Sequence, residues 1–230
     1  MKDVYLSMIE ERAYHGLTYV IAMGDGNRIC YILLPEGLHK DGIKLIEASA
    51  QKFSCNIVLV AGMDWNADMT PWPSPGVFKK EKPFEGRAKD FLKEFMTDSV
   101  PGIEGVLSLR DPERYLVGIS LSGLFALWTI FLTDCFKAIA SISGSLWYDN
   151  LVNWVREQTL VNTGAKVHLS LGDKERNSKN PRMAIVEDAT GEIAEILTGK
   201  GLTVDYQIVP GTHFSPLAPR LELALNAILR

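Results

Sequence analysis

A serine stands between small residues in Val117-Gly118-Ile119-Ser120-Leu121-Ser122-Gly123. The apolar run Tyr115–Gly118 predicts a strand before the serine, and Leu121–Leu132 predicts an apolar helix directly after it. A chain that turns this sharply from strand to helix needs small neighbours, because the two elements approach each other closely, and Gly118 supplies one. The context is typical of the strained turn that exposes a nucleophilic serine at the end of a sheet.

Ser120 is therefore the candidate nucleophile. The amide N–H of Leu121, at the predicted helix N-terminus, would point at an oxyanion that forms beside the serine. A serine that merely caps the helix would explain the position, but a cap requires neither flanking glycines nor a matching histidine and acid downstream. Ser122 is a weaker alternative nucleophile, because it would lie inside the helix.

His213 is the candidate general base. It lies in the loop Pro210–Phe214, which follows a strand expected over Thr203–Val209, and a loop there can reach back to the serine. Imidazole is the side chain best suited to accept a hydroxyl proton near neutral pH. The remaining histidines lie in polar turns or within a strand and are interpreted as structural: His15, His39 and His168.

The acid that orients the imidazole should come between the serine and the histidine, after a strand. Leu169–Glu175 ends a strand and offers two carboxylates, Asp173 and Glu175, which the residues alone do not separate. Asp188 and Glu192 are expected on a solvated helix face. The chain order of serine, acid and histidine is that of the α/β-hydrolases.

Strands alternate with helices along the rest of the chain. Further strands are expected at Thr18–Met23, Arg28–Leu34, Asn56–Val60, Ala138–Ile142 and Val167–Leu171, and further helices at Ile43–Phe53, Ala88–Thr97, Leu151–Gln158, Ala184–Leu197 and Pro216–Leu229. Gly24-Asp25-Gly26-Asn27 predicts a hairpin between the first two strands. The alternation predicts an α/β fold: an α/β-hydrolase domain with a mostly parallel central sheet, helices on both faces and no separate lid domain.

Composition narrows the function class. The chain has 230 residues, 47% of them hydrophobic, which is enough for a single domain over residues 1–230. A net charge of −4 gives no electrostatic basis for binding nucleic acid or an anionic membrane. Met1–Tyr5 lacks the basic and apolar regions of a signal peptide, and Cys30, Cys55 and Cys135 have no metal-ligand spacing. We therefore expect a cytoplasmic protein with three reduced, buried thiols.

Four stretches carry a resemblance to a known family. Gly118–Leu127 is similar to G-x-S-x-[GA]-G-L-x-A-L. Trp65–Trp72 and Phe84–Leu92 resemble a polar-x-x-D-x-T-P-W loop and the F-x-G-x-A-x-x-F-L helix start after it, and Ser141–Trp147 resembles S-P-S-L-W. On these motifs the chain is identified as a member of the putative-esterase family of α/β-hydrolases, which includes esterase D, feruloyl esterases and enterobactin-type siderophore esterases. Ser122 and Gly144 depart from the pattern, standing where the family has glycine or alanine and proline.

The resemblance implies a serine carboxylic-ester hydrolase that works through an acyl-enzyme. Its Gly-x-x-Glu pattern favours Glu175 over Asp173 as the acid. A siderophore-lactone hydrolase, a thioesterase, an acyltransferase and a non-catalytic binding module are the alternatives. The expected partner is a small-molecule ester, and homo-oligomerisation is left open. No cofactor or metal is implied. The turn at Gly24–Gly26 lacks the following helix that a phosphate cradle needs.

The substrate pocket is expected among loops at the strand ends. The second oxyanion donor should follow the strand Arg28–Leu34; Pro35 has no N–H, so Gly37 or Leu38 is the candidate. The long segment Gly62–Pro83 is expected to fold over the serine and to shape specificity. The residues assigned to substrate binding are Trp65, Trp72 and Trp147 as pocket walls, and Asp68, which would fix the loop by hydrogen bonding.

Overall fold

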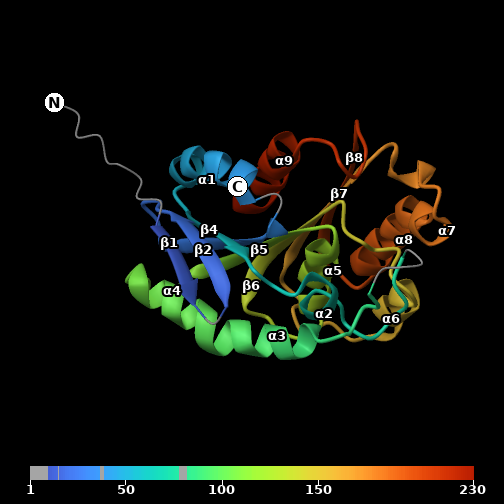
Figure 1. The fold of residues 1–230 in the computed structure, drawn as a ribbon, viewed down its shortest axis with the longest axis horizontal. Coiled ribbons are helices and arrows are strands. Elements are labelled where there is room, and N and C mark those ends of the chain that lie inside the picture. Colours follow the sequence, from blue (N-terminus) through green and yellow to red (C-terminus); the bar gives the residue numbers. More distant parts are fainter. Residues whose placement is uncertain (1–9, 15, 37–38, 78–81) are drawn as a thin grey trace.

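The computed structural model describes residues 10–14, 16–36, 39–77 and 82–230, and its centre is one twisted sheet (Figure 1). In this part of the chain eight strands pair in the order β1-β2-β4-β3-β5-β6-β7-β8. Their bounds are β1 Glu10–Tyr14, β2 Leu17–Ala22, β3 Arg28–Leu33, β4 Asn56–Ala61, β5 Glu113–Ile119, β6 Phe136–Ile142, β7 Lys166–Gly172 and β8 Thr203–Val209. Pairing is antiparallel from β1 to β4 and parallel from β4 to β8.

The hairpin predicted between the first two strands is wrong. Strand β2 pairs with β4, and β4 lies between β2 and β3. Every residue of β4 is buried, so this strand is covered on both faces and takes a partner on each edge. Asn56 stabilises the segment that connects β2 to β3. Its side chain accepts from the Gly24 N–H and donates to the carbonyl oxygens of Gly26 and Arg28. The turn at Gly24–Asn27 therefore connects two strands that are separated by a third, rather than two adjacent strands.

Helices cover both faces of the sheet (Figure 1). One face packs against α1 (His39–Phe53) and α9 (Leu217–Leu229). The opposite face packs against α3 (Ala88–Glu94), α4 (Val100–Val106), α5 (Leu121–Thr129), α6 (Leu151–Glu157) and α8 (Val186–Gly199). Two one-turn helices, α2 (Trp65–Asp68) and α7 (Pro181–Ala184), lie in loops. This is the α/β-hydrolase fold that the alternation of elements predicts.

Element boundaries differ from the predictions at a few places. The helix expected over Ala88–Thr97 continues through a π-helical turn, η2 (Phe95–Ser99), into α4. The helix expected over Ala184–Leu197 is divided at Ile185 into α7 and α8. Of the three cysteines, Cys135 is exposed rather than buried, because it lies in the short surface connection between α5 and β6.

The parallel strands bring three loops to one edge of the sheet. The segments after β5, β7 and β8 all leave from carboxyl ends, and β6 separates β5 from β7. Ligand sites in open parallel sheets lie beyond these ends. The segment between β4 and α3 lies on the same side and, within its described residues, carries α2 and a bridge between Ser74 and Phe84. None of the described helices is long and apolar enough to cross a membrane.

Candidate active site

Ser120 lies in the turn between β5 and α5, where the backbone is strained. Its φ of 58° and ψ of −122° are unusual for a residue with a side chain. The turn is tight because Gly118 packs directly on the next residues of the chain: a Cβ at Gly118 would collide with the carbonyl oxygen of Ser122. The strained residue therefore holds its hydroxyl above the end of the strand.

Ser122 has a hydrogen-bonding role rather than being a neutral replacement of glycine. Its hydroxyl accepts from the N–H of Ile119 at 2.8 Å and lies 2.7 Å from the carbonyl oxygen of Leu33, to which it donates. The side chain is fully buried and thus bridges the ends of β5 and β3. Its burial away from the surface also removes it as an alternative nucleophile.

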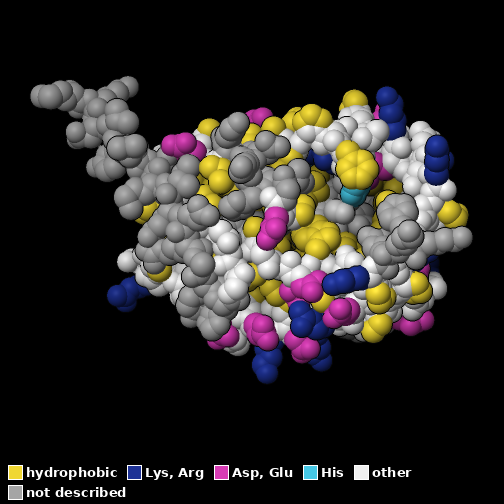
Figure 2. Space-filling model, in the orientation of Figure 1, with side chains coloured by type: hydrophobic (Ala, Val, Ile, Leu, Met, Phe, Trp, Pro, Cys, Tyr) yellow, Lys and Arg dark blue, Asp and Glu magenta, His cyan; other side chains and the backbone are white. Residues whose placement is uncertain are grey.

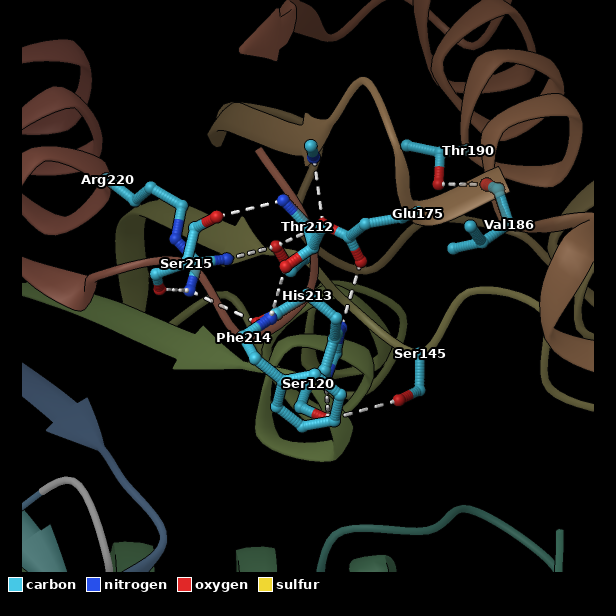
Figure 3. Close-up of polar contacts among 12 residues, drawn as sticks. Ser120, Ser145, Glu175, Val186, Thr190, Thr212, His213, Phe214, Ser215 and Arg220 are labelled. Carbon is cyan, nitrogen blue, oxygen red and sulfur yellow. Dashed lines mark hydrogen bonds and ion pairs between the residues drawn. The ribbon is translucent and has the colours of Figure 1, made fainter. Parts of the chain in front are cut away.

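His213 joins the serine to a carboxylate (Figure 3). Its Nε2 lies 3.1 Å from the Oγ of Ser120, and its Nδ1 lies 2.9 Å from Oε2 of Glu175. An ionised carboxylate only accepts hydrogen bonds, so the proton sits on Nδ1 and leaves Nε2 free to accept from the serine hydroxyl. This is the tautomer that a general base needs.

Glu175 is oriented by donors on its other oxygen. Oε1 accepts from the Ser143 hydroxyl at 2.6 Å and from the Gly172 N–H at 2.8 Å. Burial raises the pKa of this carboxyl, but the hydrogen bonds from His213, Ser143 and Gly172 outweigh burial, and its pKa lies below the usual value. The carboxylate is therefore ionised at neutral pH.

Asp173 is not part of this arrangement. It is exposed, and its Oδ1 accepts from the Gly211 N–H at 2.9 Å. The structure thus brings Ser120, His213 and Glu175 together and places Asp173 in the turn that supports the histidine loop.

Three residues of the site were not anticipated from the sequence. Ser145 donates its N–H to the Ser120 carbonyl oxygen at 2.9 Å, and the two hydroxyl oxygens lie 3.5 Å apart. Ser143 and Arg220 contact Glu175 and the histidine loop. The signal for Arg220 was present, because it is a charged residue on the apolar face of an amphipathic helix.

One of the expected oxyanion donors, Leu121, lies within the described residues. Leu121 is the first residue of α5, where an N–H has no acceptor within the helix. Gly37 and Leu38, the candidates for the second donor, lie outside the described residues. Among the residues that the structure does describe, no group of histidine, cysteine and acidic side chains could hold a metal ion.

A cavity of about 170 Å³ opens beside His213. Its apolar wall is formed by Trp147, Met183, Val186 and Phe214. Phe214 is 90% exposed and packs edge-on against the imidazole. Figure 2 shows a histidine side chain (cyan) at this surface next to hydrophobic ones (yellow).

Trp65, Trp72 and Asp68 do not line this cavity. Trp72 donates its Nε1–H to the Asp149 carbonyl oxygen at 3.0 Å and packs against neighbouring rings. Asp68 pairs with Arg87 at 2.7 Å and accepts from the backbone at the start of α2. In the described part of the Gly62–Pro83 segment, Trp72 and Asp68 hold the loop in place, and Trp65 is partly buried against the hydrophobic core.

The loop is joined to the cavity wall by Arg182. This guanidinium forms two hydrogen bonds with the Asp149 carboxylate, at 3.1 and 2.9 Å. It also donates to the carbonyl oxygens of Pro75 and Gly76, and it lies 5.6 Å from the ring centre of Trp147. Arg182 therefore links the loop to the Trp147 ring.

The chain is similar to known proteins in sequence and in fold. YbbA of Bacillus subtilis (strain 168), described as uncharacterized, is 27% identical over 181 residues, which cover 76% of this chain and 72% of YbbA. An IroE-like serine hydrolase from Shewanella oneidensis superposes with a TM-score of 0.75 at 22% identity, covering 91% of this chain and 74% of that one. The siderophore hydrolase EstA from Aspergillus nidulans gives a TM-score of 0.72 at 18% identity, covering 91% and 88%.

The family assignment rests on the sequence. Residues 43–217, which include the serine turn, the acid and the histidine, match the model of the family described as "putative esterase". The match covers well over half of the chain, and the similar structures share its fold. The chain therefore belongs to the putative esterase family and is a serine hydrolase with the α/β-hydrolase fold.

Proposed function

We propose that the protein hydrolyses carboxylic esters through an acyl-enzyme on Ser120, with His213 as general base and Glu175 as the acid that orients it. The observation that carries this proposal is the unbroken line of hydrogen bonds from Glu175 through His213 to Ser120. The strained backbone at the serine supports it, because such strain at a polar residue marks functional turns.

The reaction follows from the proton positions. The Ser120 oxygen attacks the ester carbonyl carbon while Nε2 of His213 takes the hydroxyl proton. The tetrahedral oxyanion is stabilised by the N–H of Leu121. The carbon–oxygen bond then breaks, the imidazolium gives its proton to the leaving alcohol, and water hydrolyses the acyl-enzyme by the same steps. Glu175 stays ionised throughout and stabilises the imidazolium.

A siderophore ester is a second candidate substrate. EstA, which shares the fold, is a siderophore hydrolase, and the aromatic wall formed by Trp147 and Phe214 beside His213 would accommodate an aromatic acyl group. A thioesterase or an acyltransferase would use the same three hydrogen-bonded residues. Assays with thioesters and with acceptor alcohols therefore distinguish these reactions from ester hydrolysis.

The central test combines a covalent probe with an ester series. A fluorophosphonate should label the native protein, and peptide mapping should place the adduct on Ser120. Ser120→Ala should abolish labelling and lower kcat on p-nitrophenyl esters by roughly 10⁴- to 10⁶-fold. An adduct on Ser122 or Ser143 would refute the assignment. A folded wild-type protein that neither labels nor turns over esters, thioesters or lactones would instead indicate a binding module.

We also propose that the protein acts in the cytoplasm on small-molecule esters. Cys30, Cys55 and Cys135 are free thiols in the structure, which agrees with a reducing compartment. Fractionation of the source cells with an antibody tests the location, and recovery of the protein in the medium would contradict it.

A further inference from the structure

Arg220 is a buried cation that the proposed reaction does not yet involve. It lies on the inner face of α9 and is only 5% exposed. One terminal nitrogen, Nη2, donates to the carbonyl oxygens of His213 at 3.3 Å and Ser215 at 2.6 Å, and Nε donates weakly to that of Pro216 at 3.4 Å. The guanidinium thus holds the backbone of the loop that carries His213 (Figure 3).

The other terminal nitrogen, Nη1, contacts the acid through a hydroxyl. It lies 2.5 Å from the Oγ of Ser143, which in turn lies 2.6 Å from Oε1 of Glu175. A guanidinium can only donate, so the Ser143 oxygen accepts from Arg220 and its single proton is directed at Glu175. The donor pattern therefore fixes the direction of the Ser143 hydrogen bond.

The backbone holds Ser143 in this position. The residue has a positive φ of 46°, and its N–H donates to the Ser170 carbonyl oxygen at 2.7 Å. Because the turn is anchored on β7, the same strand that leads to Glu175, the hydroxyl and the carboxylate move together.

Burying a guanidinium on an apolar helix face lowers the free energy of unfolding, because the charge loses its hydration. Burial lowers the pKa of Arg220, and the nearby carboxylate of Glu175 raises it, so the two charges partly compensate each other across Ser143. The pair does not form a direct salt bridge, because the hydroxyl lies between them. A cost of this kind is retained where the group performs a task.

We propose that Ser143 and Arg220 form a relay that holds Glu175 and the His213 loop in register. Both ends of the Glu175–His213 hydrogen bond are attached to one guanidinium: the histidine directly, through its backbone carbonyl, and the carboxylate through the Ser143 hydroxyl. Ser143 and Arg220 are thus positioning residues that act through Glu175 and His213. The inference rests on the proposed hydrolase function.

Ser143→Ala is the first variant for the test, because it removes the hydroxyl and does not change the chemistry of Arg220 or Glu175. Loss of a hydrogen bond to a charged group should lower kcat on a p-nitrophenyl ester by roughly 10- to 100-fold, while KM changes by less than about 2-fold. Ser141→Ala is the matched control: Ser141 lies on β6, is buried, and its hydroxyl has no partner within the described residues. The control should keep kcat.

A double-mutant cycle shows whether Ser143 acts through the acid. In the Glu175→Gln background, Ser143→Ala should cost less than about 3-fold further in kcat. Arg220→Lys keeps the positive charge but loses the two separate terminal nitrogens of the guanidinium. The loss of kcat that it causes should also be smaller in the Glu175→Gln variant than in the wild type. Fluorophosphonate titration gives the concentration of competent sites, so misfolded protein is not counted.

The outcomes separate the two proposals. An active wild type whose Ser143→Ala variant matches Ser141→Ala in kcat overturns the relay and leaves the hydrolase function standing. Losses from Ser143→Ala and Glu175→Gln that multiply, or a loss confined to KM, also overturn it. A wild type with no more activity than Ser120→Ala overturns the function itself.

Discussion

Replacing Glu175 by glutamine tests the hydrogen-bonded line most directly, because the amide has nearly the shape of the carboxylate. In the native site both carboxylate oxygens accept: Oε2 from His213, and Oε1 from Ser143 and the Gly172 N–H. An amide offers one acceptor oxygen and one NH₂ group, which can only donate. If its NH₂ group faces His213, that donor opposes the Nδ1 proton and favours the other tautomer, in which Nε2 carries the proton and cannot accept from the serine.

The opposite orientation of the amide is no better. Its NH₂ group would then face Ser143, whose hydroxyl can rotate, and the Gly172 N–H, which the backbone fixes. One buried donor would be left without its acceptor, at a cost of about 1–3 kcal/mol. Both orientations also lose the negative charge that stabilises the imidazolium. We therefore expect kcat to fall roughly 10²- to 10⁴-fold, equivalent to about 3–5 kcal/mol of transition-state stabilisation.

The assay is steady-state hydrolysis of a p-nitrophenyl ester, with Asp173→Asn as the matched control. The Asp173 carboxylate accepts from the Gly211 N–H, and an asparagine oxygen can accept the same bond, so kcat should change by less than about 3-fold. Equal small losses from both variants would show a serine–histidine dyad or an acid from elsewhere. A larger loss from Asp173→Asn would refute the placement of the acid.

Three further predictions follow from the contacts around the site. Trp147→Ala should change the acyl-chain preference in kcat/KM by about 1–3 kcal/mol because it removes a cavity wall, whereas Trp72→Ala should mainly lower Tm; an unchanged ester profile in Trp147→Ala would argue against this pocket. Ser122→Ala should lower the urea-derived free energy of unfolding by about 1–3 kcal/mol, since the Leu33 carbonyl loses its donor; full stability would show that the strands re-pair directly. Burial lowers the pKa of His168 below its usual 6.5 despite the hydrogen bond to Asp205. The unfolded chain therefore takes up a proton first as pH falls, and the free energy of unfolding should decrease below pH 6.5. His168→Gln should make this dependence shallower in urea titrations at several pH values, and an identical slope would count against the buried neutral histidine.

The meeting of Ser120 and His213 could be predicted because each follows a strand end that periodicity identifies. Which carboxylate would meet the histidine could not, because Asp173 and Glu175 are two positions apart in one turn. The 3₁₀ turn η3 (Glu175–Asn177) that starts at Glu175 points its side chain inward, while Asp173 caps the neighbouring loop. Only the family resemblance favoured Glu175.

The other differences come from long-range packing. Strands β2 and β3 do not form a hairpin, because β4, which comes later in the chain, lies between them and pairs with both. The aromatic residues of the segment predicted a pocket at Trp65 and Trp72, but Trp72 packs against neighbouring rings and Trp65 against the hydrophobic core. The cavity is lined instead by the loop after β6, the turn at Glu175, α7, α8 and the histidine loop. A local sequence pattern carries no information on which face of a loop an aromatic ring will occupy.

The turn that follows β6 contacts both Glu175 and Ser120, the two ends of the hydrogen-bonded line through His213. Ser143 donates to Glu175, and two residues later the Ser145 N–H donates to the carbonyl oxygen of Ser120. Gly144, between them, lies where a Cβ would crowd the Ser141 hydroxyl and approach Gly123 of α5. In the sheet β6 lies between β5 and β7, which lead to Ser120 and Glu175. The strand that carries none of Ser120, Glu175 and His213 is therefore the one whose following turn is hydrogen-bonded to two of them.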